Sequence, residues 1–245
     1  MDELRAALRD KVRLIRQISP VNLERSANSI IPIPTSATPA LDTIARPIAH
    51  FALVIGASTG ASALVRLFQR FPAASDCAIV VAQHMPQKFT TTFAERLNRL
   101  NGFLVKEADN FEILKQGCAY ICPGGQCVEL LSSASGFAIR TTEPAPSDRY
   151  VPSVDRLFST AAQVLGDRVA GAILTGMGDD GANGAREIKA SGGTIYVESA
   201  ASAVVSGMPQ STINAVNVDG IFAIDDLCEV LVKYVKNSSA SRKTV

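Results

Sequence analysis

A serine flanked by glycines is the first candidate for chemistry in this sequence. It is Ser58, in the pentapeptide Gly56-Ala57-Ser58-Thr59-Gly60. A short apolar run, 51–55, precedes the pentapeptide, and an amphipathic stretch, 61–71, follows it. Gly-x-Ser-x-Gly at a strand-to-helix turn is typical of a nucleophilic serine, because the tight turn leaves no room for side chains at the glycine positions. Taken alone, the pentapeptide is equally consistent with a plain glycine-rich turn.

A nucleophilic serine needs a neighbouring base, and the chain has only two histidines. His50 precedes the first apolar run, so it would lie about 17 Å from Ser58, at the other end of that strand, at about 3.3 Å per residue. His84 directly follows the second apolar run, 78–83, and is expected at a carboxyl end. In a parallel sheet this end lies on the same edge as Ser58, where ligands usually bind. We therefore favour His84 as the base, over its being a structural loop histidine.

Two adjacent carboxylates, Asp179 and Asp180, offer the third group of a catalytic triad, which orients the imidazole and stabilises its cation. They follow a buried-type strand, 169–174, again at a predicted carboxyl end. Neighbouring side chains seldom point the same way, so only one can serve, and the spacing does not choose between them. The alternative is that both aspartates cap the helix beginning near Ala182. Three candidate groups at three strand ends on one edge are less expected by chance than any one of them.

Other motifs with similar residues fit the sequence poorly. The turn 56–61 also resembles the glycine-rich turn of short-chain dehydrogenases, but no tyrosine here has the lysine of their Tyr-x-x-x-Lys. The chain has no Gly-Lys-Ser/Thr of a phosphate-binding loop. The segment 179–190 lacks acidic residues at the third and twelfth positions of a calcium loop. With two histidines and no Cys-x-x-Cys, we expect no metal site, and we expect no cofactor.

The elements that must place these groups alternate between strands and helices. The expected strands are 51–55, 78–82, 169–174, 194–197 and 220–224. The expected helices are 61–71, 91–100, 151–165, 182–190 and 225–236. This alternation predicts an α/β fold, a doubly wound, mostly parallel sheet with helices on both faces. In the middle of the chain, an antiparallel hairpin excursion is expected from the runs 119–122, 127–131 and 137–141.

Composition divides the chain into four segments. Residues 1–18 have apolar side chains at helical spacing and predict an amphipathic helix. Residues 19–49 are rich in proline, serine and threonine and predict a linker. The catalytic domain is expected over 50–236, and a disordered tail over 237–245.

The bulk properties of the chain argue against several classes of protein. A net charge of +1 gives no electrostatic footprint for nucleic acid or for an anionic membrane surface. No stretch approaches the roughly 18 consecutive apolar residues of a spanning helix, and the charged N-terminus lacks the apolar core of a signal peptide. Five irregularly spaced cysteines indicate reduced thiols and a cytoplasmic location. We expect a monomer.

Five blocks of the sequence resemble one family closely, the chemoreceptor glutamate methylesterases, CheB. They span roughly 51–235 in the order of the family, and together they are far more specific than a lone Gly-x-Ser-x-Gly. The blocks are Ile55-Gly56-Ala57-Ser58-Thr59-Gly60, Gln83-His84-Met85-Pro86, Pro152-Ser153-Val154-Asp155, 174–181 and Val205-Ser206-Gly207-Met208-Pro209.

The resemblance implies hydrolysis of glutamyl methyl esters on the cytoplasmic helices of chemotaxis receptors, often with deamidation of glutamine as a second activity. It implies Ser58 as the nucleophile, His84 as the base and Asp180 as the orienting acid. It also implies that Thr59 and Met177 lie near the oxyanion, with Met177 contributing its backbone N–H.

The sequence departs from the family pattern at three places. Ala61 stands where the family usually has a second glycine, and only Arg149 remains of the basic segment before Pro152. The family's receiver domain, of roughly one hundred residues, does not fit into residues 1–50, although 1–18 resembles a receiver's last helix. The chain is then either an excised catalytic portion or a natural form without phosphorylation control. A serine esterase for another acyl substrate, and a non-catalytic binding module that kept the fold, stay open as alternatives.

Overall fold

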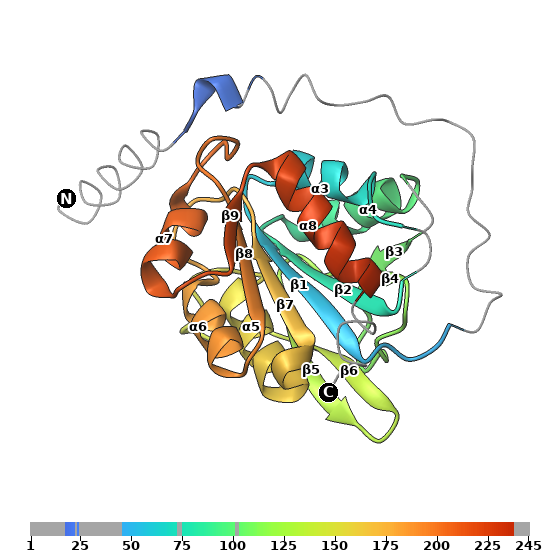
Figure 1. Ribbon diagram of the computed structural model, residues 1–245. Coiled ribbons are helices and arrows are strands. Elements are labelled where there is room, and N and C mark those ends of the chain that lie inside the picture. Colours follow the sequence, from blue (N-terminus) through green and yellow to red (C-terminus); the bar gives the residue numbers. More distant parts are fainter. Residues whose placement is uncertain (1–17, 23, 25–45, 73–74, 101–102, 238–245) are drawn as a thin grey trace.

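The computed structural model describes residues 18–22, 24, 46–72, 75–100 and 103–237 (Figure 1). A seven-stranded sheet crosses the middle of the molecule in the order β3-β4-β2-β1-β7-β8-β9. Every neighbouring pair in it is parallel. Its strands are β1 (Phe51–Ala57), β2 (Cys77–Gln83), β3 (Leu104–Glu107), β4 (Cys118–Ile121), β7 (Val169–Ile173), β8 (Thr194–Glu198) and β9 (Gly220–Phe222).

Helices cover both faces of this sheet, so the predicted α/β class is confirmed (Figure 1). One face packs against α3 (Ala61–Phe68), α4 (Gln87–Asn98) and α8 (Ile224–Asn237). The other packs against α5 (Val154–Leu165), α6 (Ala182–Ala190) and α7 (Gly207–Ala215), with the short 3-10 helix η1 (Gly166–Arg168) after α5.

The central strand β1 explains why the fold has two apolar cores. Its side chains alternate between the faces, so that Ala52 and Val54 join the core under α5 and α6. Leu53 and Ile55 join the core under α3, α4 and α8. All four residues are fully buried, which is why the run is apolar throughout rather than alternating with polar residues.

The prediction for 119–122 is wrong, because these residues do not belong to a hairpin. They overlap β4, which pairs in parallel with β2 and β3 inside the main sheet. All four residues of β4 are buried, as suits an internal strand. The antiparallel pair consists of β5 (Cys127–Ser133) and β6 (Gly136–Thr142) alone.

Two elements, β3 and α7, were not expected from the sequence. β3 has only four residues, and two of them are the charged Lys106 and Glu107. The helix α7 contains Pro209 and several small or polar residues, so it shows no clear apolar stripe. Local pattern is weak in both, and packing against neighbouring elements decides their structure.

A short N-terminal segment contacts the loop that follows β8. Ile18 forms an isolated antiparallel bridge with Val205, and the Ser19 N–H donates to the Val204 carbonyl at 2.7 Å. The Asn22 side chain donates to the Ala203 carbonyl at 2.8 Å. The predicted helix over 1–18, apart from Ile18, most of the predicted linker over 19–49 and the predicted tail, apart from Asn237, lie outside the described residues.

Candidate active site

The site lies where the strand order reverses. The chain leaves β1 for β2 on one side and later returns to β7 on the other side of β1. In open α/β sheets, the carboxyl ends of strands beside such a switch point form a crevice that binds ligands. The turns after β1, β2 and β7 carry Ser58, His84 and Asp180 respectively.

Sheet register places Ser58 and His84 side by side. The last paired residues of β1 and β2 are Ala57 and Gln83, and each candidate follows directly after one of them. The His84 N–H still donates to the Ala57 carbonyl at 2.9 Å, and Gln83 Nε2 donates to the Ser58 carbonyl at 2.5 Å. Neighbouring strands lie about 4.8 Å apart, so the two side chains start from adjacent backbone positions. Within the described part of the chain, no hydrogen bond joins Ser58 Oγ to the imidazole.

The imidazole of His84 is held by Asp180. The His84 Nε2 and Asp180 Oδ2 atoms are 2.8 Å apart, and the two side chains are 15% and 1% exposed. Because Nε2 faces the carboxylate, Nδ1 is the ring nitrogen left for a proton from a serine. Asp179 turns away from His84, and its carboxylate accepts from Tyr150 and Arg149 instead.

The buried Asp180 carboxylate lies at the N-terminus of α5. It accepts the backbone N–H groups of Val154 at 2.8 Å and Asp155 at 2.9 Å, and the Ser153 hydroxyl at 3.4 Å. A helix N-terminus stabilises an anion through its free N–H groups and its dipole. The N-terminus of α5 therefore stabilises the negative charge of Asp180, which an imidazolium at His84 would need as its partner.

A second carboxylate, that of Asp155 in α5, binds the backbone just after Asp180. Its Oδ1 accepts the Gly181 N–H at 3.0 Å and the Gly184 N–H at 2.8 Å. Burial, together with the nearby charge of Asp180, raises the pKa of Asp155. The two aspartates thus lock α5 and α6 together, and neither Asp179 nor Asp180 caps α6 with its side chain. The Pro-Ser-Val-Asp block was the only sequence feature that pointed to Ser153 and Asp155, and it predicted no role for either residue.

Thr59 directly follows Ser58, and Met177 directly follows Gly176, which packs against Ser58. Thr59 Oγ1 lies 2.9 Å from Thr175 Oγ1. Gly176, which precedes Met177, packs so closely that a Cβ there would lie 3.0 Å from Ser58 Cβ. Within the described residues, neither the Thr59 N–H nor the Met177 N–H donates a hydrogen bond. Both donors are therefore available to a ligand oxygen.

Sequence reasoning missed a buried carboxylate beneath the site. Glu198, at the end of β8, accepts the Thr175 N–H at 2.8 Å and the Ser202 hydroxyl at 2.9 Å. It is 1% exposed, and burial raises its pKa. No motif singles out Glu198, because only the packing of β8 beside β7 brings it to Thr175.

The described residues offer no exposed thiol and no metal centre at this edge. All five cysteines are free and buried, and burial raises the pKa of the thiols of Cys118, Cys122, Cys127 and Cys228. Over the same part of the chain, no cluster of three His, Cys, Asp or Glu residues could hold a metal ion. Nor is any described helix long and apolar enough to cross a membrane.

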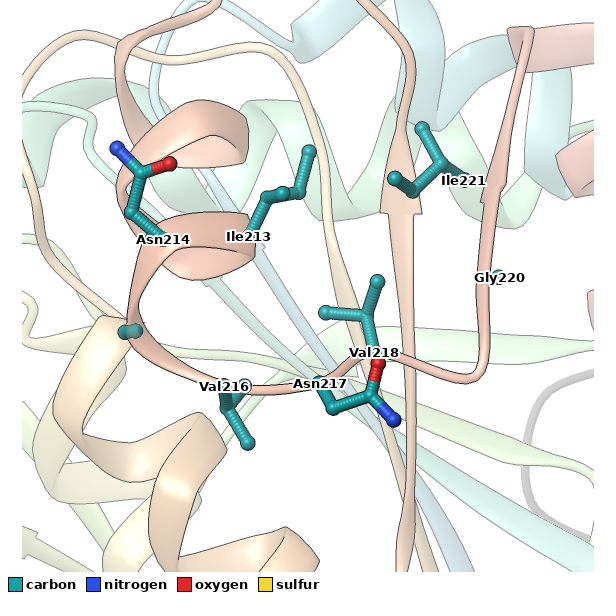
Figure 2. A pocket seen from close by; sticks show the side chains of 8 residues that line it. Ile213, Asn214, Val216, Asn217, Val218, Gly220 and Ile221 are labelled. Atoms are coloured by element: carbon teal, nitrogen blue, oxygen red, sulfur yellow. The ribbon is translucent and has the colours of Figure 1, made fainter.

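A pocket of about 550 Å³ lies away from these groups, between the end of α7 and strand β9 (Figure 2). Apolar side chains and two asparagine amides line it. It contains none of the candidate site residues, so the sequence motifs and this pocket mark different places. Its lining residues are Ile213, Asn214, Ala215, Val216, Asn217, Val218, Gly220 and Ile221.

Known proteins match this chain over most of the α/β body. The family model of the CheB methylesterases covers residues 53–231. A protein-glutamate methylesterase/protein-glutamine glutaminase 6 of Anaeromyxobacter dehalogenans is 43% identical over 76% of this chain and 55% of its own length. One numbered 1 from Myxococcus xanthus is 36% identical over 93% of this chain and 63% of its own length. The crystal structure of the Thermotoga maritima CheB methylesterase catalytic domain superposes with a TM-score of 0.73 at 34% identity, covering 76% of this chain and 98% of that one.

The fold and the site together define a doubly wound α/β protein with serine, histidine and aspartate gathered at its switch point. Given the family match, the chain belongs to the CheB methylesterase family. It spans between about half and two thirds of the length of the curated relatives it matches first.

Proposed function

We propose that this chain is a serine hydrolase that removes methyl groups from glutamyl esters on the cytoplasmic helices of chemotaxis receptors. The observation that carries the proposal is the 2.8 Å contact between His84 Nε2 and the buried Asp180 carboxylate, one strand away from Ser58. Such a pair supports a general base beside a serine nucleophile. The names of the relatives, protein-glutamate methylesterase/protein-glutamine glutaminase, support glutamyl methyl esters in proteins as the substrate class.

In the first half-reaction, Ser58 Oγ attacks the carbonyl carbon of the methyl ester, and its proton passes to His84 Nδ1. Asp180 stabilises the resulting imidazolium at Nε2. The tetrahedral intermediate collapses, the bond to the methoxy oxygen breaks, and His84 protonates the departing methanol. A glutamyl ester of Ser58 remains.

Water completes the cycle in the second half-reaction. It attacks the acyl-serine while giving a proton to His84, and the imidazolium then returns that proton to Ser58 Oγ. The products are free glutamate and intact enzyme, so the sequence of steps needs no cofactor. An amide substrate follows the same path with ammonia as the leaving group, which accounts for deamidation of glutamine.

Each half-reaction passes through a tetrahedral intermediate with a negatively charged oxygen. We assign the binding of this oxyanion to the backbone N–H groups of Thr59 and Met177. Two features support this assignment. Both N–H groups lack an acceptor within the described residues, and Gly176 brings the Met177 loop into contact with Ser58. Preorganised donors aimed at a developing negative charge commonly contribute about 10²–10³-fold each to kcat.

The decisive experiment measures methanol release from methylated receptor membranes by the wild-type chain and by Ser58→Ala. We expect the substitution to lower turnover by at least about 10³-fold, as for other triad members. Retention of most of the turnover in Ser58→Ala would exclude Ser58 as the nucleophile. Faster turnover of a generic small ester than of the methylated receptor would instead point to a different acyl substrate.

A further inference from the structure

A tyrosine ring covers one face of the His84 imidazole. The centroids of the Tyr150 and His84 rings are 5.3 Å apart, and their planes differ by 5°. Tyr150 precedes α5, the helix whose N-terminus holds Asp180. The imidazole therefore meets Asp180 at its edge and Tyr150 at its face, and nothing proposed above uses the second contact.

Tyr150 is itself held by the aspartate that the triad leaves unused. Its hydroxyl donates to Asp179 Oδ1 at 2.8 Å, and Arg149 Nη1 lies 3.2 Å from Asp179 Oδ2. The Arg149 guanidinium also lies over the phenol ring, 5.3 Å from its centroid. Burial raises the pKa of Tyr150, so the phenol is neutral and donates its proton near neutral pH.

The segment before Tyr150 is anchored as well. Asp148 accepts from Arg156 of α5 at 2.6 Å and from the Ala145 N–H at 2.7 Å. Gly178 makes room for the phenol, because a Cβ at that position would lie 2.3 Å from the Tyr150 oxygen, and φ there is +91°. The phenol is thus held by Asp179, Arg149 and the backbone at Gly178.

We propose that Tyr150 is a positioning residue for His84, which holds the plane of the imidazole and stabilises the imidazolium through its π face, and that Asp179 holds Tyr150 in place. The proposal rests on the proposed function, in which His84 takes the serine proton. A single hydrogen bond at Nε2 leaves the ring free to rock about its broad Cβ–Cγ torsion. A parallel ring at this separation restricts that rotation, and a cation within about 6 Å of an aromatic centroid is attracted to it.

The two adjacent aspartates then have separate tasks. Asp180 acts on the edge of the imidazole directly, while Asp179 acts on its face through Tyr150. The charged groups around the two rings are these carboxylates and Arg149, and the described contacts place no other ion pair on either ring.

The test compares Tyr150→Leu with Tyr150→Phe in the full chain. Leucine covers the imidazole without a π face, whereas phenylalanine keeps the ring but loses the hydroxyl. We expect Tyr150→Leu to lower kcat for methanol release about tenfold while KM stays within about twofold, and to move the acid limb of the pH–rate profile about half a pH unit lower. Tyr150→Phe should recover most of that loss.

Labelling of Ser58 by a serine-directed phosphonate gives a second readout that needs no receptor. Tyr150→Leu should slow this labelling about tenfold as well, because it depends on the same base. A wild-type chain that is labelled but releases no methanol would overturn the proposed substrate and leave the role of Tyr150 intact. The failure of one proposal is therefore distinguishable from the failure of the other.

Tyr196→Leu is the matched control, since Tyr196 is a half-buried tyrosine on β8 that packs against Phe222 with ring centroids 6.4 Å apart. It should leave both rates within about twofold, because it touches no site residue. Equal losses in Tyr150→Leu and Tyr196→Leu, equal losses in the leucine and phenylalanine variants, or a change confined to KM would each overturn the positioning role.

Asp179→Ala tests the second half of the proposal. It should lower kcat about threefold in the wild-type background and have no further effect in Tyr150→Leu, because Asp179 acts only through Tyr150. Additive losses in the double variant would show that Asp179 acts by another route.

Discussion

At the scale of single residues, Asp179 and Asp180 are neighbours in the sequence with opposite environments. Asp180 is buried and accepts two backbone N–H groups of α5 besides the imidazole. Asp179 is exposed and accepts from Tyr150 and Arg149. Because consecutive side chains point in different directions, a single turn can present one carboxylate to a buried site and the other to its rim.

We expect Asp180→Asn to impair both chemistry and stability. The amide would direct N–H groups at donors that now face a carboxylate, namely His84 Nε2 and the Val154 N–H. By analogy with other triads, kcat should fall about 10³–10⁴-fold. The free energy of unfolding should fall by about 1–3 kcal/mol, because a buried donor is left unpaired.

Methanol release and chemical denaturation check these two expectations. Asp179→Asn is the matched control, since it makes the same exchange at the exposed neighbour and should leave stability within about 0.5 kcal/mol. Full activity in Asp180→Asn would contradict the assignment of Asp180 as the orienting acid.

At the scale of elements, the turn after β2 is braced by the turn after β4. Gly124 packs against the backbone that follows His84, so that a Cβ at position 124 would lie 2.5 Å from the Met85 carbonyl oxygen and 2.4 Å from the Gln87 nitrogen. Backbone atoms cannot yield as a flexible side chain would. This close approach accounts for a glycine in the turn that follows β4.

Gly124→Ala should therefore displace the His84 turn. We expect kcat to fall about 10–100-fold, since misplacing a catalytic group by about 1 Å costs on that order. Gly193→Ala is the control, because a Cβ there would be similarly crowded, 2.8 Å from the Val169 carbonyl oxygen, but at the amino ends of β7 and β8. It should lower the melting temperature with little change in kcat, and an equal loss of kcat in both variants would contradict the bracing role.

At the scale of the whole molecule, Glu198 joins parts of the chain that are distant in sequence. It accepts from Thr175 after β7 and from Ser202 in the loop after β8. The Ser202 hydroxyl in turn accepts the N–H of Ile224, where α8 begins. The loop after β8 also contacts the N-terminal residues Ile18 and Asn22.

The raised pKa of Glu198 predicts a pH-dependent stability. Its ordinary value is 4.5, so above this pH the unfolded chain releases the proton while the folded chain retains it. Stability from the protonated carboxyl is thus full below pH 4.5 and is lost as pH rises through the folded pKa.

Thermal unfolding of wild type and Glu198→Gln, measured from below to above pH 4.5, checks the direction of this change in stability. The wild-type melting temperature should decline relative to the variant as pH rises above 4.5. Glu229→Gln, at an exposed carboxyl on α8, should instead follow the wild-type curve. Parallel curves for wild type and Glu198→Gln would contradict the prediction.

Local sequence determined much of this protein. Apolar runs with glycine-rich ends predicted an α/β fold, because burial on both faces and tight turns each need particular residues. The rule that parallel strands share a carboxyl edge was enough to bring Ser58 and His84 together and to set His50 aside. The family blocks then added Asp180, Thr59 and Met177 as predictions.

Tertiary structure decided what depends on pairing between distant segments. The sequence could not place β4 inside the sheet, because a short apolar run suits a hairpin and an internal parallel strand equally well. It could not separate Asp179 from Asp180 by spacing, or find Tyr150 and Glu198, since each gains its partner only when α5 and β8 pack beside β7. Strand ends are local features of a chain, whereas the neighbours of a side chain are set by the order of the strands.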